Sequence, residues 1–124
     1  MSTARAGLQL DLQLPASLDG LDPETELSLY RIAQEALTNV TRHAQARALA
    51  VRLERQGQRL VLAIADDGRG FDAAGIEPGE HYGLPGMRER ATAVGGDLEV
   101  RSWPGRGTTV CFSVEVTDGA RTNL

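Results

Sequence analysis

The segment 23–44 constrains the fold more than any other stretch, because its apolar and polar residues recur with helical spacing on two different faces. Asp22 followed by Pro23 is typical of a helix N-cap and first turn, so we expect a helix from Pro23 to about His43 or Ala44. The face expected to pack on a sheet carries Tyr30, Ala33, Leu37, Val40 and Ala44. The opposite face carries Ser28, Arg31, Glu35, Thr38, Asn39 and Arg42.

This polar face offers a chemically coherent set of side chains. Glu35, Asn39 and Arg42 stand at positions i, i+4 and i+7 and so lie along one line of the helix. A carboxylate can orient a hydroxyl or a water, an amide oxygen can ligate a hard cation, and a guanidinium can pair with phosphate. The set favours a nucleoside triphosphate site, and the alternative is an ordinary solvated helix face.

The segments beside this helix show the patterns of strands. Residues 8–14 place leucine at every second position, which predicts a half-buried strand that ends at Pro15. Residues 47–54 and 59–65 predict a hairpin around a tight turn, and the second arm is apolar on both faces, as expected of an inner strand. Further strands are expected at 97–102 and 108–116.

A carboxylate and two glycines follow the inner strand directly. Asp66 would be held rigidly there, and Gly68 and Gly70 would let the backbone turn sharply and approach a flat ligand. Asp66 could accept a hydrogen bond from the exocyclic amine of adenine. The alternative is that the Asp-Gly pair simply makes a turn. Arg69 is expected to be a solvated turn residue.

The stretch 75–86 is rich in glycine and proline and has little periodicity, which predicts a mobile loop. It leads into a helix start bounded by Gly83 and Gly86, where backbone N–H groups can bind phosphate oxygens. A flexible connector followed by a capped helix is the structural alternative. We expect the helix to end at Gly95 and Gly96.

Composition excludes several classes of function. The 124 residues, 41% hydrophobic, suit one globular domain, and the net charge of −4 argues against a nucleic-acid or anionic membrane surface. No apolar run approaches the roughly 20 residues needed to span a bilayer. Cys111 is alone, and His43 and His81 form no zinc cluster at a known spacing, so we expect a soluble, cytoplasmic protein. All 13 basic residues are arginine, which excludes a Walker A loop and a protein-kinase strand lysine.

Four motifs, in this order, resemble the N, G1, G2 and G3 boxes of the Bergerat-fold ATPases: Glu35-x-x-x-Asn39, Asp66-x-Gly68-x-Gly70, Gly83-x-x-Gly86 and Gly105-x-Gly107-Thr108. The amino-acid sequences of segments 31–44 and 83–91 resemble those of the catalytic ATP-binding domain of bacterial sensor histidine kinases, specifically those that control NarL-type response regulators. The resemblance covers 8–116, with 1–7 and 117–124 as flexible ends. It implies an α+β fold, a two-layer α/β sandwich with a mixed, mostly antiparallel sheet and helices on one face.

The resemblance also implies ATP as the ligand, Mg²⁺ as the cofactor and a role for each matching residue. Asn39 would hold the magnesium ion, while Arg42 and His43 would face the phosphate chain and Glu35 would orient the attacking group as the catalytic residue. His43 could instead merely fill the helix edge. The base would be recognised by Asp66, Gly68, Gly70 and Thr108, and the loop would fold over the phosphates at Gly83 and Gly86.

One departure from the family is large. A complete histidine kinase carries a helical dimerisation segment with the acceptor histidine, and neither His43 nor His81 resembles that acceptor. We therefore expect a fragment or a stand-alone module, monomeric in isolation, that binds Mg-ATP without completing autophosphorylation. Its partners would be the histidine-bearing dimerisation domain and, indirectly, a NarL-type regulator. It could belong to the cytoplasmic part of a membrane-bound sensor. The alternatives are an anti-sigma-factor-type serine kinase and a non-enzymatic nucleotide-binding module.

Overall fold

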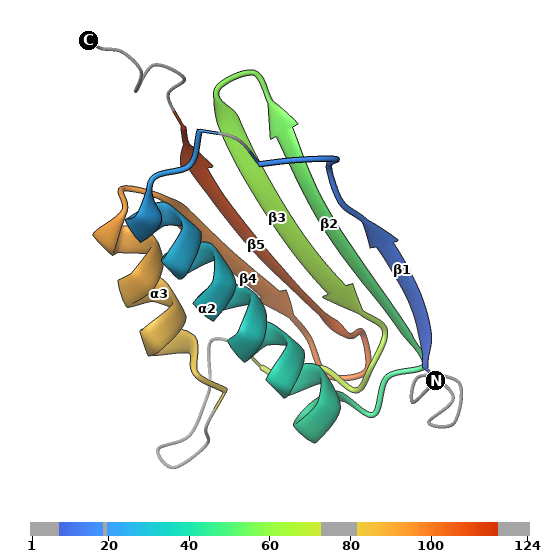
Figure 1. Cartoon of the computed structure of the whole chain (residues 1–124). Coiled ribbons are helices and arrows are strands. Elements are labelled where there is room, and N and C mark those ends of the chain that lie inside the picture. The colour runs from blue at the N-terminus through green and yellow to red at the C-terminus, as the bar shows by residue number, and fades with distance from the viewer. Residues whose placement is uncertain (1–7, 19, 73–81, 117–124) are drawn as a thin grey trace, which may run out of the picture.

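The computed structural model describes residues 8–18, 20–72 and 82–116 (Figure 1). The expected loop tip with His81, and the expected flexible ends, lie outside the described residues. The elements, in chain order, are β1 (Gln9–Gln13), α2 (Pro23–Asn39), η1 (Val40–Ala44), β2 (Ala48–Gln56), β3 (Arg59–Asp66), α3 (Leu84–Ala93), β4 (Asp97–Ser102) and β5 (Thr108–Glu115). No helix within the described ranges is both long and apolar enough to cross a membrane.

The strands form one five-stranded sheet in the order β1-β2-β3-β5-β4. β1 pairs with β2 in parallel, and every other pair is antiparallel. The strand that is apolar on both faces, β3, occupies the centre, and α2 and α3 lie side by side on one face of the sheet (Figure 1). The predicted α+β sandwich, with a mixed and mostly antiparallel sheet, is confirmed.

The helix α2 begins as predicted, but its buried face differs from the prediction. The carboxylate of Asp22 accepts a hydrogen bond from the Thr25 N–H at 2.8 Å, and Pro23 opens the first turn. Tyr30 and Leu37 were expected on the sheet and are 59% and 36% exposed. The buried stripe of α2 is instead Thr25, Ser28, Leu29, Ile32 and Ala36. Val40, also expected on the packing face, is buried as predicted.

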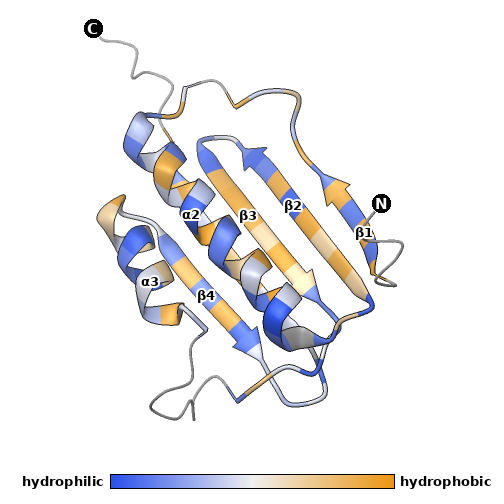
Figure 2. Ribbon diagram, turned by 60° about the horizontal axis from the view of Figure 1, so that its bottom comes forward, coloured by the Kyte–Doolittle hydropathy of each residue, from blue (hydrophilic) through white to orange (hydrophobic). Residues whose placement is uncertain are grey.

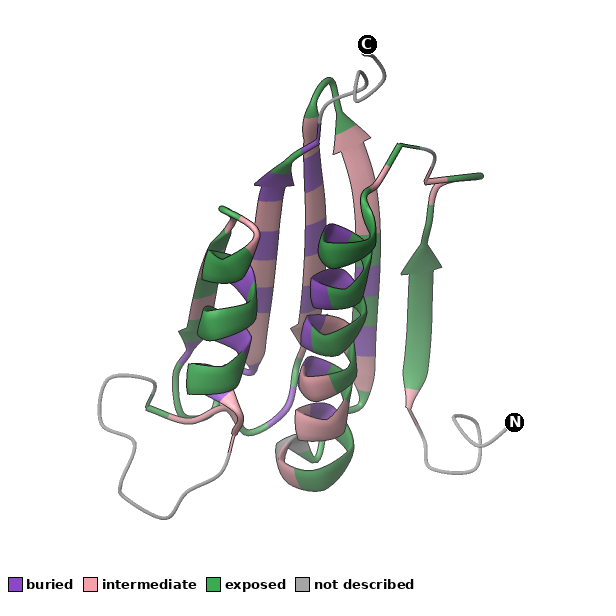
Figure 3. Cartoon of the chain, turned by 60° about the vertical axis from the view of Figure 1, so that its left-hand side comes forward, coloured by how far each residue is buried: buried purple, intermediate pink, exposed green. Residues whose placement is uncertain are grey.

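Packing between the two helices explains this rotation. The hydroxyl of Ser28 donates to the carbonyl of Arg90 in α3 at 3.0 Å, so the flank of α2 that carries Ser28 is covered by a neighbouring helix. Tyr30, on the other flank, faces solvent. Among the described residues, α3 is the helix packed beside α2, and the outer surface of α2 is largely exposed (Figure 3). Helical periodicity locates an apolar stripe, but the second helix decides how far that stripe extends on each side.

The end of α2 also departs from a continuous α-helix. The α-helix stops at Asn39, and Val40–Ala44 continue as a single π-helical segment, η1. Gln45, with φ 53° and ψ 43°, then adopts the left-handed conformation that ends the helix. Single π turns of this kind are frequent at functional sites.

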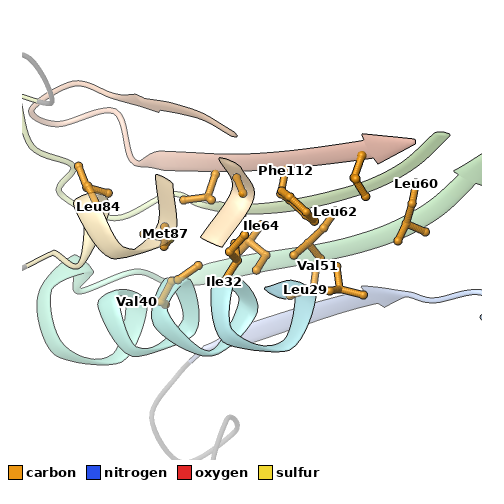
Figure 4. Packing of buried hydrophobic residues seen from close by; sticks show 14 of the residues in the cluster. Leu29, Ile32, Val40, Val51, Leu60, Leu62, Ile64, Leu84, Met87 and Phe112 are labelled. Carbon is orange, nitrogen blue, oxygen red and sulfur yellow. The ribbon is translucent and has the colours of Figure 1, made fainter. Parts of the chain in front are cut away.

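The hydrophobic core lies between the helices and the helix-facing side of β2, β3 and β5 (Figure 4). Ile32, Leu60 and Phe112 have no exposed surface, and Met87 of α3 is 1% exposed. The second helix starts at Leu84, two residues before Gly86, and its last residue is Ala93. Gly95, with φ 72°, and Gly96 follow the C-cap and donate their N–H groups to carbonyls of the last turn, so the predicted helix stop is confirmed.

The prediction that the first strand is half-buried is wrong. Leu10, Leu12 and Leu14 are 44%, 53% and 59% exposed, and β1 stands beyond the edge of the helical layer (Figure 3). Leu10 and Leu12 pair with Leu49 and Val51, which are buried, so the two leucines do point toward the helical side. β1 is the edge strand of the sheet on the side away from α3, however (Figure 2), and its leucines remain exposed there.

Candidate functional site

Two rows of side chains cross the sheet where β3 ends and β5 begins. Ile64, Val110 and Val100 are register partners on β3, β5 and β4 and form an apolar row. Two residues further along, Asp66, Thr108 and Ser102 are register partners on the same three strands and form a polar row. Residues two apart on a strand point to the same face, so both rows face the helices. An apolar floor therefore ends in a line of one carboxylate and two hydroxyls.

The carboxylate of Asp66 is fixed by backbone N–H groups. Its Oδ1 accepts from the Gly68 N–H at 2.7 Å, and the Thr108 N–H also stabilises the charged form. Burial raises the pKa of Asp66 above its ordinary 3.8, and these hydrogen bonds offset part of that effect. A half-buried carboxylate with its orientation fixed is a strong acceptor for an N–H donor that enters the cavity.

The segment after β3 is tied closely to the turn before β5. A side chain at Gly107, whose φ is 77°, would overlap the carbonyl oxygen of Asp66, and one at Gly70 would overlap that of Trp103. The Gly105 N–H also donates to the carbonyl of Arg69 at 2.6 Å. These contacts need glycine at both close approaches. They hold the two predicted glycine motifs against each other at one end of the sheet.

A pocket opens above the two rows, between the sheet and the end of α2. The space between the atoms that line it, counted together with the solvent at its open mouth, is about 450 Å³. Five of the predicted site residues line it, and they are Asn39, His43, Asp66, Gly70 and Thr108. The remaining lining residues are Ala36, Val40, Ile64, Arg69, Phe71, Tyr82, Leu84, Val100 and Val110.

Aromatic rings and one amide form the helical side of the pocket. Phe71 and Tyr82 stack with ring centroids 4.2 Å apart, and His43 meets Tyr82 edge-on at 5.0 Å. The Nδ2 of Asn39 donates to the carbonyl of Tyr82 at 2.6 Å. His43 stands one helical turn after Asn39 and lines the pocket with it, whereas Arg42 is exposed and does not line the pocket.

The other predicted residues lie beside the pocket or at its entrance. Gly68 is buried beneath Asp66, and the half-buried side chain of Glu35 lies directly against Gly83, at the start of α3. Gly86 lines a separate groove between α2 and α3. The structure therefore places the residues predicted to recognise a base close together, and it places Glu35 near the end of the predicted loop.

Some residues in the pocket wall or behind it carried no usable signal in the sequence. Phe71 precedes the predicted loop and Tyr82 lies within it, so the two rings meet only in three dimensions. Ser102 looks like an ordinary last residue of a strand. Arg69 is exposed, as expected of a turn residue, but it also lines the pocket. Ser102 lies beside Thr108 because of the register in which β4 pairs with β5, and the sequence does not reveal that register.

Residues 24–118 match the family described as histidine kinase-, DNA gyrase B-, and HSP90-like ATPases. The chain belongs to this ATPase family. The ATPase domain is 34% identical over 111 residues to the signal transduction histidine-protein kinase/phosphatase DegS of Brevibacillus brevis, covering 90% of the chain and 28% of DegS. It is 39% identical over 93 residues to UhpB of Salmonella typhimurium, a histidine-protein kinase/phosphatase, covering 73% of the chain and 18% of UhpB. The domain thus spans less than a third of either relative, and the predicted resemblance to sensor histidine kinases is confirmed.

Solved structures agree on the fold. The histidine kinase domain of the blue-light activated histidine kinase from Erythrobacter litoralis EL346 superposes with a TM-score of 0.77 at 24% identity. That match covers 93% of the ATPase domain and 54% of the solved chain. The Acinetobacter baumannii histidine kinase AdeS superposes with a TM-score of 0.73 at 17% identity, covering 92% and 57% of the two chains. At these identities the likeness supports the shared fold alone.

Proposed function

We propose that this ATPase domain binds Mg-ATP and donates the γ-phosphoryl group to a histidine on a dimerisation domain of a sensor histidine kinase. The observation that carries the proposal is the polar row at the end of the apolar floor. A flat base can lie on Ile64, Val110 and Val100 while its exocyclic amine donates to the carboxylate of Asp66. Family membership and the histidine kinase relatives support the same conclusion.

Recognition of the base would rest on Asp66 and Thr108. The carboxylate is acceptor-only when ionised, so it favours adenine, with its amine, over a base that carries a carbonyl at that position. The hydroxyl of Thr108 stands next to Asp66 in the row and can exchange a hydrogen bond with the ring. A base without the amine would leave the half-buried carboxylate without a donor, and this cost discriminates between bases more strongly than apolar contacts do.

The residues at the end of α2 suit a magnesium ion and phosphates. Asn39 lines the pocket with its amide nitrogen engaged by the Tyr82 carbonyl, which leaves the amide oxygen as the hard ligand. Mg²⁺ is commonly held by one or two protein oxygens together with substrate phosphates, so a single amide fits. When bound, the ion neutralises the charge of the phosphate oxygens. Arg42, just beyond the pocket, and His43 would pair with the phosphate chain.

The transfer step would use an acceptor supplied by another domain. A neutral imidazole nitrogen of the acceptor attacks the γ-phosphorus, the bond to the β,γ-bridging oxygen breaks, and ADP leaves. Glu35, beside Gly83, would orient the attacking imidazole. We expect no stable histidine phosphorylation when the domain is incubated with ATP alone. A cytoplasmic setting and a NarL-type regulator as the final recipient belong to this proposal.

Calorimetric titration of Mg-ATP tests the binding half of the proposal. Asp66→Asn should weaken binding by about ten- to a hundredfold, because one charge-assisted hydrogen bond is lost. Asp97→Asn is the matched control, since it removes the same charge at the start of β4, where Asp97 pairs with Arg59 at 2.9 Å. A folded, unmodified domain that does not bind ATP, or equal losses in both variants, would refute the site.

A transfer assay tests the catalytic half. The domain, labelled ATP and a separately supplied histidine-bearing dimerisation domain should yield label on that histidine. Phosphate on a serine or threonine of an added protein would instead favour an anti-sigma-factor-type serine kinase. ATP binding without transfer to any acceptor would favour a non-enzymatic nucleotide-binding module.

A further inference from the structure

The hydroxyl of Ser102 contacts three groups from both motifs that meet at the pocket. Ser102 ends β4 and is 4% exposed. Its Oγ accepts from the N–H of Phe71 at 2.9 Å, lies 3.2 Å from the carbonyl of Gly107, and lies 2.7 Å from the Oγ1 of Thr108. The hydroxyl therefore connects the segment after Asp66 with the turn that precedes β5.

The single proton of Ser102 links these contacts. A serine hydroxyl donates one hydrogen bond and accepts up to two. When Ser102 donates to the Gly107 carbonyl, the hydroxyl of Thr108 must donate to Ser102, and Thr108 then presents only a lone pair to the pocket. When Ser102 donates to Thr108, the proton of Thr108 is free to point into the pocket. The state of Ser102 thus decides whether Thr108 offers a donor or an acceptor.

Ser102 does not line the pocket, whereas Thr108 does, so an effect of Ser102 on a ligand passes through its neighbour. Asp66, Thr108 and Ser102 are register partners on three adjacent strands, and all three face the helical side. Loss of the Ser102 hydroxyl would free the rotation of the Thr108 hydroxyl. It would also leave the partly buried N–H of Phe71 without its acceptor.

We propose that Ser102 is a positioning residue for base recognition, which sets the direction of the Thr108 hydroxyl and anchors the segment after Asp66. The inference rests on the proposed ATP site and extends it to a residue behind the pocket wall. It assigns the polar row a specificity function, because a hydroxyl of fixed direction distinguishes bases by their donors and acceptors.

A double-mutant cycle on the whole chain tests this role. Mg-ATP and the inosine analogue, which carries a carbonyl in place of the amine, are titrated into the unmodified protein, Ser102→Ala, Thr108→Val and the double variant. Ser102→Ala should weaken ATP binding by about five- to tenfold and reduce the preference for ATP over the inosine nucleotide. In the Thr108→Val background the same change should alter ATP binding by less than about twofold, because the hydroxyl it orients is absent.

Ser113→Ala is the matched control. Ser113 is a partly buried strand serine on β5 whose hydroxyl accepts from Arg59 at 2.9 Å, far from the polar row. It should leave both affinities unchanged. Thermal melting of each variant separates binding loss from unfolding. Ser102→Cys, with a similar volume and a weak donor, replaces Ser102→Ala in the cycle if the alanine variant does not fold.

The outcomes separate this inference from the proposed function. Unchanged ATP affinity in Ser102→Ala, or equal losses with and without the Thr108 hydroxyl, overturns the positioning role and leaves the ATP site intact. Equal weakening of ATP and the inosine nucleotide also overturns it, because general loosening of the site would not discriminate between bases. Absence of ATP binding by the folded, unmodified protein overturns both.

Discussion

Replacing Gly107 by alanine tests how closely the site depends on the approach of two backbones. Gly105 and Gly107 lie in the same turn, with φ of 80° and 77°, so alanine is strained by its backbone conformation at both positions. That strain costs about 1–2 kcal/mol for each substitution. The surroundings differ, because a Cβ at Gly105 meets nothing within 4 Å, whereas one at Gly107 overlaps the Asp66 carbonyl.

The difference in stability between Gly105→Ala and Gly107→Ala measures the effect of the close approach between the turn and the Asp66 carbonyl. Overlap with backbone cannot be relieved by a side-chain rotation, so β3 and the turn must move apart, at a further cost of about 1–3 kcal/mol. We expect Gly105→Ala to lower the free energy of unfolding by about 1–2 kcal/mol and Gly107→Ala by about 2–5 kcal/mol. The same movement would displace Asp66, so ATP binding should weaken by more than about tenfold in Gly107→Ala and little in Gly105→Ala.

Urea unfolding followed by circular dichroism, together with ATP titration of the folded variants, measures both quantities. The slope of the unfolding free energy against urea should stay the same for the three proteins, since the surface exposed on unfolding is unchanged. Equal destabilisation by the two alanines would refute the reasoning, because it would mean that backbone conformation alone requires glycine. If Gly107→Ala is destabilised but binds ATP normally, the position of the turn does not determine the geometry of the ATP site.

Three further predictions concern the core and the two adjacent aspartates. Leu60→Ala should destabilise the domain by about 2–5 kcal/mol in urea unfolding, whereas Leu12→Ala, on the exposed strand, should cost about 0.5 kcal/mol or less. The N–H groups of Ala48 and Arg47 lower the pKa of Asp67, so its stabilisation is present above the ordinary 3.8 and lost as pH falls. Asp67→Asn should therefore lower the urea midpoint at neutral pH, and the difference should narrow below pH 3.8. Burial raises the pKa of Asp66, so ATP affinity should fall on acidification while pH is still above 3.8, and titrations of Asp66→Asn should lack that transition.

The elements of this fold were predictable because each has a local signal. The N-cap at Asp22, the apolar arm that became β3, and the bounds of β4 follow from neighbouring residues alone. The order of the four motifs, and their resemblance to a known family, led to the fold class. Local periodicity and turn chemistry are sufficient for such features.

The errors came from features that depend on distant neighbours. The leucine alternation of β1 reports a strand correctly, but burial depends on whether a helix covers that edge, and the helical layer stops short of it. The π turn after Asn39 has no sequence signature that periodicity reveals, so the change from α-helix to π-helix could not be predicted. Ser102 joins the site only through the pairing of β4 with β5.

The polar row has a consequence for folding. Asp66, Ser102 and Thr108 come from three strands. β5, which pairs with β3 in this row, follows α3 and β4 in the chain. Pairing across such sequence separations forms late, so a partly folded chain with only the β2–β3 hairpin holds Asp66 but no binding site. A ligand that needs the whole row binds only the complete fold, and its binding energy adds to the stability of the entire domain. ATP should therefore raise the melting temperature in proportion to the logarithm of its concentration, and occupancy of the site would protect the full sheet from proteolysis.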